Sequence, residues 1–156
     1  MRSNFGAKRY FGLASGCSRL RLQAVDGAAF DSWCRPPHPG GHDAIFLDAS
    51  TSSGDTAPPP ALSSRAALRR LRQMLRVGGA LIINVLGSAR HVDEVEARVF
   101  AAFASVDEVR RISTNEGNVV LAALRGGQGA CSRSGADELV WREACAAVGL
   151  RARGED

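Results

Sequence analysis

The sequence predicts an α/β fold with a mixed sheet, and two observations carry this prediction. The stretch His42–Gly87 contains an apolar strand, an Arg-rich helix and a second apolar strand, which is the unit that builds parallel sheets. Farther along the chain, two short alternating segments flank Thr114–Gly117, a pattern typical of an antiparallel hairpin. A parallel unit followed by an antiparallel pair indicates one mixed sheet with helices packed against it.

The first third of the chain predicts the end of a helix and one strand. Phe5–Leu13 has the composition of the last turns of a helix, with Gly12 and Gly16 near its end. Arg19–Val25 alternates apolar and polar residues and stops at Asp26-Gly27, a turn dipeptide, so we expect a strand there. The Pro-rich segment 35–41 is expected to be a loop, because proline prevents regular structure.

The central unit is predicted in four pieces. Ala44–Leu47 is a continuous apolar run, as expected of a strand covered on both faces. Ala49–Pro60 is a polar loop that ends in three prolines. Ala61–Arg76 places apolar residues at helical spacing and arginines on the opposite side. A Gly-Gly pair at 78–79 is expected to end this helix before the buried strand Leu81–Val85.

The last third predicts a helix, a hairpin and a further helix. His91–Phe103 carries valines and a phenylalanine at helical spacing. Val109–Ser113 and Asn118–Leu124 have the pattern of two strands joined by a short turn. We expect a glycine-rich loop over 126–135 and a final helix over Ala136–Val148.

The composition is that of a globular protein without a membrane segment. Of the 156 residues, 45% are apolar and 23% are charged, and no run approaches the roughly 20 apolar residues of a membrane helix. The N-terminus lacks the apolar core of a signal peptide, so we expect a cytoplasmic protein. The four cysteines and three histidines show no zinc-ligand spacing, and no metal site is expected.

The positive net charge of +4 comes almost entirely from arginine, because Lys8 is the sole lysine. The densest cluster lies in the predicted helix Ala61–Arg76, where it is either a solvated outer face or a stripe that binds phosphates. Modules that bind nucleic acid usually add stacking aromatics, and this segment has none. We therefore expect a solvated face and no nucleic-acid partner.

Five segments occur in the same order and at similar spacing in one enzyme family. They are Ala24–Gly27, Asp43–Asp48, Pro58–Ala61, Gly79–Asn84 and Val109–Ile112. The chain resembles the class I S-adenosylmethionine-dependent methyltransferases, and within them the spermidine-synthase-like methyltransferases that modify elongation factor 1-alpha on lysine and at its N-terminus. The resemblance spans roughly Gly6–Leu124 and implies a Rossmann-like sheet that ends in an antiparallel hairpin.

The resemblance gives roles to three residues. Asp26 matches the acidic residue that approaches the adenine amino group of the cofactor, and Gly27 lets the backbone come close; the alternative is an ordinary Asp-Gly turn. Asp48 matches the strand-end carboxylate beside the methyl donor, where it would contact the cofactor and orient the substrate amine or take its proton. The alternative for Asp48 is a strand-end residue that caps a neighbouring backbone amide.

Two elements of the family are not found in the sequence: the glycine-rich turn after the first strand and the acidic residue that ends the second strand. If Gly6–Leu13 is the helix after the second strand, residues 1–125 form a partial domain that begins at the third strand, and 126–156 add a loop and a helix. The family's sheet, ordered three, two, one, four, five, seven, six, would then lack its first two strands. Ala44–Leu47 would become a bare edge. We expect the chain alone to be marginally folded, or to pair Arg19–Val25 with that edge, and not to be an autonomous enzyme.

The resemblance implies transfer of a methyl group from S-adenosylmethionine to a protein amine, with a translation elongation factor as the expected kind of substrate. An aminopropyltransferase acting on polyamines is less favoured, because the loop Asp48–Asp55 lacks the Asp-Pro pairing of those enzymes. A further alternative is a non-catalytic remnant that serves as an interaction module, in a homo-oligomer or with a paralogue.

Overall fold

The computed structural model describes residues 26, 29, 40–103, 108–114, 117–126 and 151–152. The chain divides into two compact units, Met1–Arg35 and Pro36–Asp156. In the first unit, the Ala29 N–H donates a hydrogen bond of 3.0 Å to the carbonyl of Asp26. The described helices and strands all belong to the second unit.

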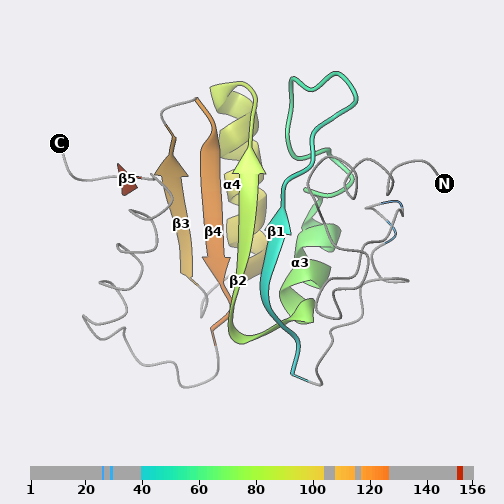
Figure 1. Ribbon diagram of the computed structural model, residues 1–156, viewed down its shortest axis with the longest axis vertical. Coiled ribbons are helices and arrows are strands. Elements are labelled where there is room, and N and C mark those ends of the chain that lie inside the picture. The colour runs from blue at the N-terminus through green and yellow to red at the C-terminus, as the bar shows by residue number, and fades with distance from the viewer. Residues whose placement is uncertain are drawn as a thin grey trace, which may run out of the picture. The chain divides into compact units, whose positions relative to one another are not determined.

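The second unit contains a five-stranded mixed sheet of order β1-β2-β4-β3-β5 (Figure 1). The strands are β1 (His42–Leu47), β2 (Leu75–Val85), β3 (Glu108–Ser113), β4 (Val119–Leu124) and β5 (Arg151–Ala152). Strands β1 and β2 are parallel, and the other neighbouring pairs are antiparallel. The predicted parallel unit followed by an antiparallel hairpin is therefore confirmed.

Two helices cover one face of this sheet (Figure 1). Helix α3 (Arg65–Met74) connects β1 to β2, and α4 (Ala89–Phe103) connects β2 to β3. Each helix begins at a serine whose hydroxyl accepts a hydrogen bond from a backbone N–H of the first turn, at 3.2 Å for Ser64 and 3.3 Å for Ser88. The two helices also contact each other, so they form one layer.

The hydrophobic core lies between the helices and the sheet. Its fully buried side chains come from both helices, β2 and β4, and they include Leu68, Leu75, Leu81, Ile83, Val85, Val95, Val99, Phe103 and Leu121. From Gly79 to Val85 the buried residues of β2 alternate with partly exposed ones, as expected of a strand with one face in the core. The apolar stripe predicted for α4 is confirmed. That of α3 is confirmed at Ala67, Leu68 and Leu71, whereas Leu75 belongs to β2.

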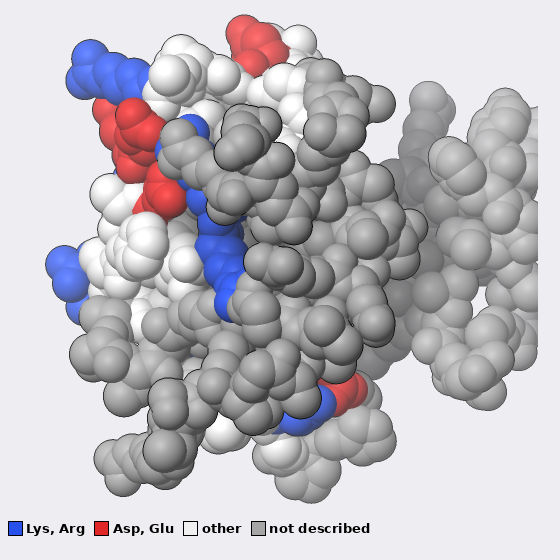
Figure 2. Space-filling view, turned by 90° about the vertical axis from the view of Figure 1, so that its left-hand side faces the viewer, with Lys and Arg blue, Asp and Glu red and all other residues white. Residues whose placement is uncertain are grey.

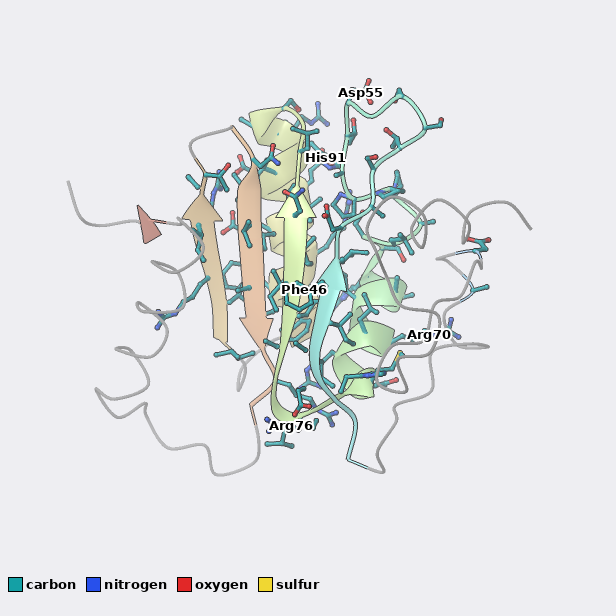
Figure 3. The ribbon with its side chains drawn as sticks, viewed as in Figure 1. Phe46, Asp55, Arg70, Arg76 and His91 are labelled. Carbon is teal, nitrogen blue, oxygen red and sulfur yellow. The ribbon has the colours of Figure 1, made fainter. Side chains whose placement is uncertain are left out.

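The face of β1 and β2 opposite the helices is much more exposed. Phe46 is 73% exposed and lies beside Ile82 in the strand register. Figure 3 shows this phenylalanine over the middle of the sheet. Strand β1 is the end strand of the described sheet. The predicted pairing of Arg19–Val25 with β1 falls outside the described residues and stays a prediction.

Helix α3 is shorter than predicted, and the glycine pair does not end it. It begins at Arg65 rather than Ala61, because the chain after the three prolines first forms a turn. It ends at Met74, because Leu75 adopts extended backbone (φ −73°, ψ 147°) and begins β2. The glycines at 78–79 therefore lie inside a strand, which corrects the predicted role of this pair.

Arg125, just after β4, holds the end of α3 instead. Its Nη1 donates hydrogen bonds to the carbonyls of Arg72 (3.4 Å), Gln73 (3.1 Å) and Leu75. A cation is favourable at this end of a helix, where unpaired carbonyls concentrate negative charge. The backbone of Arg125 also exchanges hydrogen bonds of 2.8 and 2.9 Å with the glycines at 78–79. The end of β4 thus fixes the passage from α3 into β2.

We expect Arg125→Met to lower the free energy of unfolding by about 2 kcal/mol, because the carbonyls at the end of α3 lose a charged donor. Urea denaturation monitored by circular dichroism would measure it. Arg90→Met is the matched control, because its side chain is 87% exposed and its ion pair with Glu94 is a surface pair worth at most about 1 kcal/mol. Equal losses in the two variants would contradict the role assigned to Arg125.

The predicted helices Phe5–Leu13 and Ala136–Val148 lie outside the described residues. The predicted division of the chain into 1–125 and 126–156 stays a prediction. Strand β5 was not predicted from the sequence, and it pairs with β3 through Ala152 opposite Ile112. Among the residues described, neither helix is long and apolar enough to cross a membrane.

Candidate functional site

The carboxyl ends of the parallel strands β1 and β2 place two polar side chains next to each other. Asp48 directly follows β1, and Asn84 is the penultimate residue of β2. The Asn84 amide nitrogen Nδ2 donates a hydrogen bond of 3.0 Å to Oδ1 of Asp48. Open α/β sheets bind their ligands at this edge. The predicted site residue Asp48 therefore lies where a ligand is expected.

Asp48 is exposed. Its carboxylate oxygen Oδ2 forms no hydrogen bond with the described residues. Among the described residues, the hydrogen-bond partner of Asp48 is the side chain of Asn84, and no backbone amide takes part. The alternative role of a backbone cap is therefore not what the structure shows. Because Asn84 holds Oδ1, the carboxylate has a preferred orientation and Oδ2 can accept a hydrogen bond from a ligand.

Sequence reasoning did not assign a role to Asn84. The available signal was a single amide side chain within the apolar strand Leu81–Val85. A polar residue in such a strand needs a partner, since an unpaired amide is costly to shield from water. Its partner, Asp48, depends on the register of β1 against β2, in which Leu47 lies beside Ile83.

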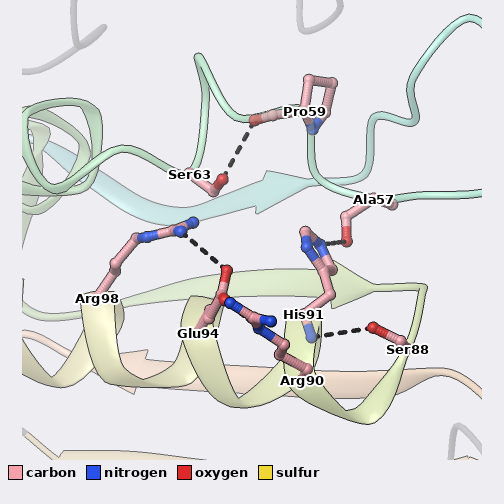
Figure 4. A network of polar contacts seen from close by, with 8 residues as sticks. All are labelled: Ala57, Pro59, Ser63, Ser88, Arg90, His91, Glu94 and Arg98. Carbon is pink, nitrogen blue, oxygen red and sulfur yellow. Dashed lines mark hydrogen bonds and ion pairs between the residues drawn. The ribbon is translucent and has the colours of Figure 1, made fainter.

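The loop after Asp48 is fastened at its far end. The Ala57 N–H donates to the Leu86 carbonyl over 2.9 Å, and the Leu86 N–H donates to the Ala57 carbonyl over 3.0 Å. The Nε2 of His91 also donates to the Ala57 carbonyl, at 3.1 Å (Figure 4). Ala57 and Pro58 are buried. The loop base is thereby fixed against the end of β2 and the start of α4.

The tip of this loop, residues 51–56, presents Asp55 to solvent (Figure 3). The Thr51 N–H donates to the Thr56 carbonyl over 2.8 Å and closes the turn. Oδ1 of Asp55 accepts hydrogen bonds from the hydroxyls of Ser53 (2.5 Å), Thr51 (3.2 Å) and Thr56 (3.3 Å). The Ser53 hydroxyl, and next that of Thr51, hold the pKa of Asp55 below its ordinary value, because they stabilise the ionised carboxylate.

We expect Ser53→Ala to raise the pKa of Asp55, because the largest stabilising contact of the ionised form is removed. Because the folded-state pKa of Asp55 is lowered, its stabilising contribution is present above the ordinary aspartate pKa and is lost as the pH falls through the lowered value. A carboxyl carbon NMR titration would measure both values. Ser52→Ala is the matched control, since no hydrogen bond joins Ser52 to Asp55. The same shift in both variants would contradict the assignment.

The other two predicted site residues, Asp26 and Gly27, do not belong to the unit that contains Asp48. Asp26 belongs to the first compact unit, where it is exposed. Gly27 lies outside the described residues. Their roles in binding adenine stay predictions that follow from the resemblance. Within the described part of the chain, no three His, Cys, Asp or Glu side chains gather as metal ligands would.

The groups gathered at the strand ends suit one kind of ligand. Asp48 offers a free carboxylate oxygen, Asn84 orients it, and Asp55 adds a second exposed carboxylate on the same loop. No Lys or Arg occurs between Asp48 and Thr56. Carboxylates accept hydrogen bonds from amines and hydroxyls and attract cations, so this edge fits an amine-bearing ligand better than an anionic one.

Comparisons with known proteins bear on the fold. A scan against protein-family models found no match, and a search of curated proteins found none either. Among solved structures, the crystal structure of human methyltransferase-like protein 13 in complex with SAH superposes with a TM-score of 0.66 at 23% identity. The superposition covers 98% of this chain and 69% of that chain.

The resemblance stated from the sequence is thus confirmed at the level of the fold. The strand order β1-β2-β4-β3 corresponds to strands four, five, seven and six of the methyltransferase sheet, and the hairpin stands at the expected end. An identity of 23% establishes the architecture alone. This chain therefore shares its fold with that methyltransferase-like protein, and the described residues include the parallel pair β1 and β2 and the antiparallel hairpin of β3 and β4.

Proposed function

We propose that this chain binds S-adenosylmethionine and that Asp48 serves the transfer of its methyl group to a protein amine. One observation carries the proposal. Asp48 and Asn84 meet at the carboxyl ends of parallel strands, in a fold shared with a methyltransferase-like protein whose crystal structure contains SAH. The chemistry of the donor set, a carboxylate held by an amide, fits an amine substrate.

The residues of this chain supply orientation and proton handling. When bound, S-adenosylmethionine supplies a methyl group on a positively charged sulfonium. Only the neutral form of an amine has the lone pair needed for attack, so the substrate amine must lose a proton. Asn84 holds Oδ1 of Asp48, which leaves Oδ2 to accept a hydrogen bond from the amine. Asp48 thereby orients the amine or takes its proton.

A lysine side chain or an N-terminal amine is the proposed substrate class. At neutral pH a lysine side chain is fully protonated and an N-terminal amine is largely protonated, so both carry positive charge. The loop between Asp48 and Thr56 carries Asp55 and no basic residue. The electrostatic attraction favours a basic segment of a protein at this edge. A cytoplasmic protein, such as a translation elongation factor, belongs to this class and is the proposed kind of partner.

Calorimetry with S-adenosylmethionine and S-adenosylhomocysteine tests the proposal, after the intact mass of the purified chain has been checked. Saturable binding with a Kd on the order of 1 μM would support the proposal, and it would mean that the site forms without the glycine-rich turn and the acidic residue that are not found in this sequence. Asp26→Ala is expected to weaken it, because the adenine amino group would lose its acceptor, whereas Asp48→Ala should leave much of the affinity. Absence of binding by the folded chain would contradict the proposal that this chain carries the cofactor site.

A non-catalytic interaction module is the second candidate function. The observation that favours it is Phe46, which is 73% exposed on the end strand of the described sheet. Exposed apolar residues on edge strands are typical places for pairing with another chain. Sedimentation velocity separates the two candidates: a Phe46-dependent complex, with a second copy or a paralogue, in a chain that binds no cofactor would support this function over catalysis.

A further inference from the structure

Helix α3 carries a basic surface that the proposed function does not use. We define this α3 basic surface by Arg65, Arg69 and Arg70, all of which are exposed. Figure 3 shows Arg70 on the side of α3 away from β1 and β2. The helix contains no Asp or Glu, and none occurs anywhere from Thr56 to Val92. This stretch of the chain is therefore charged with one sign.

Helix α4 has similar charges but balances them. Its Arg90 and Arg98 both pair with Glu94, at 3.0 and 3.4 Å, and Figure 4 shows the contact between Arg98 and Glu94. On the side of the molecule drawn in Figure 2, basic and acidic side chains likewise lie next to one another. Arg65 and Arg69, by contrast, form no ion pair or hydrogen bond with their side chains among the described residues.

The positions of Arg65 and Arg69 are unfavourable for the stability of α3. Arg65 and Arg69 are four residues apart, where like charges on a helix repel. Arg65 also lies in the first turn, near the positive end of the helix dipole, where an acidic residue would be favourable. Arg65 and Arg69 break these local rules, and no acidic side chain among the described residues pairs with them. Residues of this kind are expected at functional surfaces.

We propose that the α3 basic surface binds the phosphate backbone of nucleic acid without recognising base sequence. Between its arginines the outer side of α3 exposes Ala66 and Gln73, so it offers no apolar or aromatic anchor. Protein partners generally require such an anchor at the centre of the contact. Phosphate contacts depend on charge and need none. An acidic protein is therefore the less favoured partner.

This proposal differs from the expectation drawn from the sequence, which was a solvated face. The difference rests on the exposure of Arg65 and Arg69 and on their lack of acidic partners among the described residues, beside a second helix that pairs its arginines. The missing aromatics remain a valid observation. They restrict the proposal to the backbone, because base stacking needs exposed aromatic rings.

The test is fluorescence anisotropy of the full chain with labelled single-stranded RNA and double-stranded DNA of about 20 nucleotides per strand, from about 50 to 200 mM salt. We expect an affinity that falls as salt rises. When the logarithm of the association constant is plotted against the logarithm of the salt concentration, the slope is proportional to the number of neutralised phosphates. Each contact contributes about 0.7 to the steepness on a single strand and about 0.9 on duplex DNA. The two arms show which nucleic acid supplies the phosphates, and neither involves S-adenosylmethionine.

A pair of double variants makes the test specific. Arg65→Gln/Arg69→Gln removes two exposed cations from α3, and Arg90→Gln/Arg98→Gln removes the same net charge from α4. On single-stranded RNA we expect the α3 variant to have a slope shallower by about 1.4 and the α4 variant to retain the wild-type slope. Circular dichroism checks folding, and Arg69→Gln alone, with a change of about 0.7, serves if the double variant unfolds.

Three outcomes would overturn the proposal. The first is no binding of either nucleic acid at about 50 mM salt. The second is an equal weakening in the α3 and α4 variants, because net charge alone would then explain the affinity. The third is tighter binding to polyglutamate than to RNA or DNA, which would point to an acidic protein as the partner.

Discussion

Phe103→Ala is expected to lower the free energy of unfolding by about 3–5 kcal/mol. Phe103 is 1% exposed and is the largest fully buried side chain among the described residues. It also supports the guanidinium of Arg72, which lies 6.0 Å from the ring centroid and links α3 to α4. Truncation would open a cavity in the core between the helices and the sheet and remove that contact.

Phe100→Ala provides the matched control for this prediction. Phe100 lies on the same helix, undergoes the same chemical change and is 51% exposed. We expect its replacement to cost less than about 1 kcal/mol, because about half of this residue's surface already contacts water. Thermal and urea denaturation of the two variants would measure the difference. Similar losses at both positions would mean that α4 does not face the core as described.

The elements that the sequence predicted well are those with local patterns. Strand β1 and helix α4 matched the predicted segments to within two residues at each end. The hairpin of β3 and β4 also formed around the predicted turn at 114–117. Each pattern depends on residues close together in the sequence: a short apolar run, a 3.6-residue period, or alternation broken by turn residues.

The ends of α3 could not be predicted because distant residues set one of them. A Gly-Gly pair after an amphipathic segment usually marks the end of a helix. Here Arg125, fifty residues after Leu75, satisfies the last carbonyls, and Gly79 serves a different purpose. A Cβ at position 79 would lie 2.8 Å from the carbonyl oxygen of His42, so this glycine allows the close approach of β1.

Of the two residues that meet at the candidate site, Asp48 and Asn84, only the first could be predicted from local sequence. The position of Asp48 could be predicted from sequence, since a carboxylate that follows a buried parallel strand lies at the edge of the sheet where ligands bind. Asn84 could not, because its partner is 36 positions away and depends on the register of two strands. The unbalanced charge of Arg65 and Arg69 was likewise visible only when the contacts of α4 supplied a comparison.

In a preparation that binds S-adenosylmethionine and transfers its methyl group, Asp48→Ala is expected to lower the rate of transfer by at least about 100-fold, which is the lower range for loss of a group that handles a proton in the transition state. The cofactor affinity should change far less, because Asp48 acts mainly on the amine. The rate would be measured by transfer of labelled methyl to lysine-containing peptides at saturating S-adenosylmethionine. Calorimetry on the same preparation would give the affinity.

Two further variants decide whether an effect of Asp48→Ala is specific. Asp55→Ala removes another exposed carboxylate from the same loop, and it should affect the apparent KM for a basic peptide more than kcat, since it can only attract the substrate. Asn84→Leu keeps the carboxylate but removes its hydrogen-bond donor, and a reduced kcat with unchanged cofactor affinity would identify Asn84 as a positioning residue. Full turnover by Asp48→Ala would show that the strand-end carboxylate plays no part in the transfer.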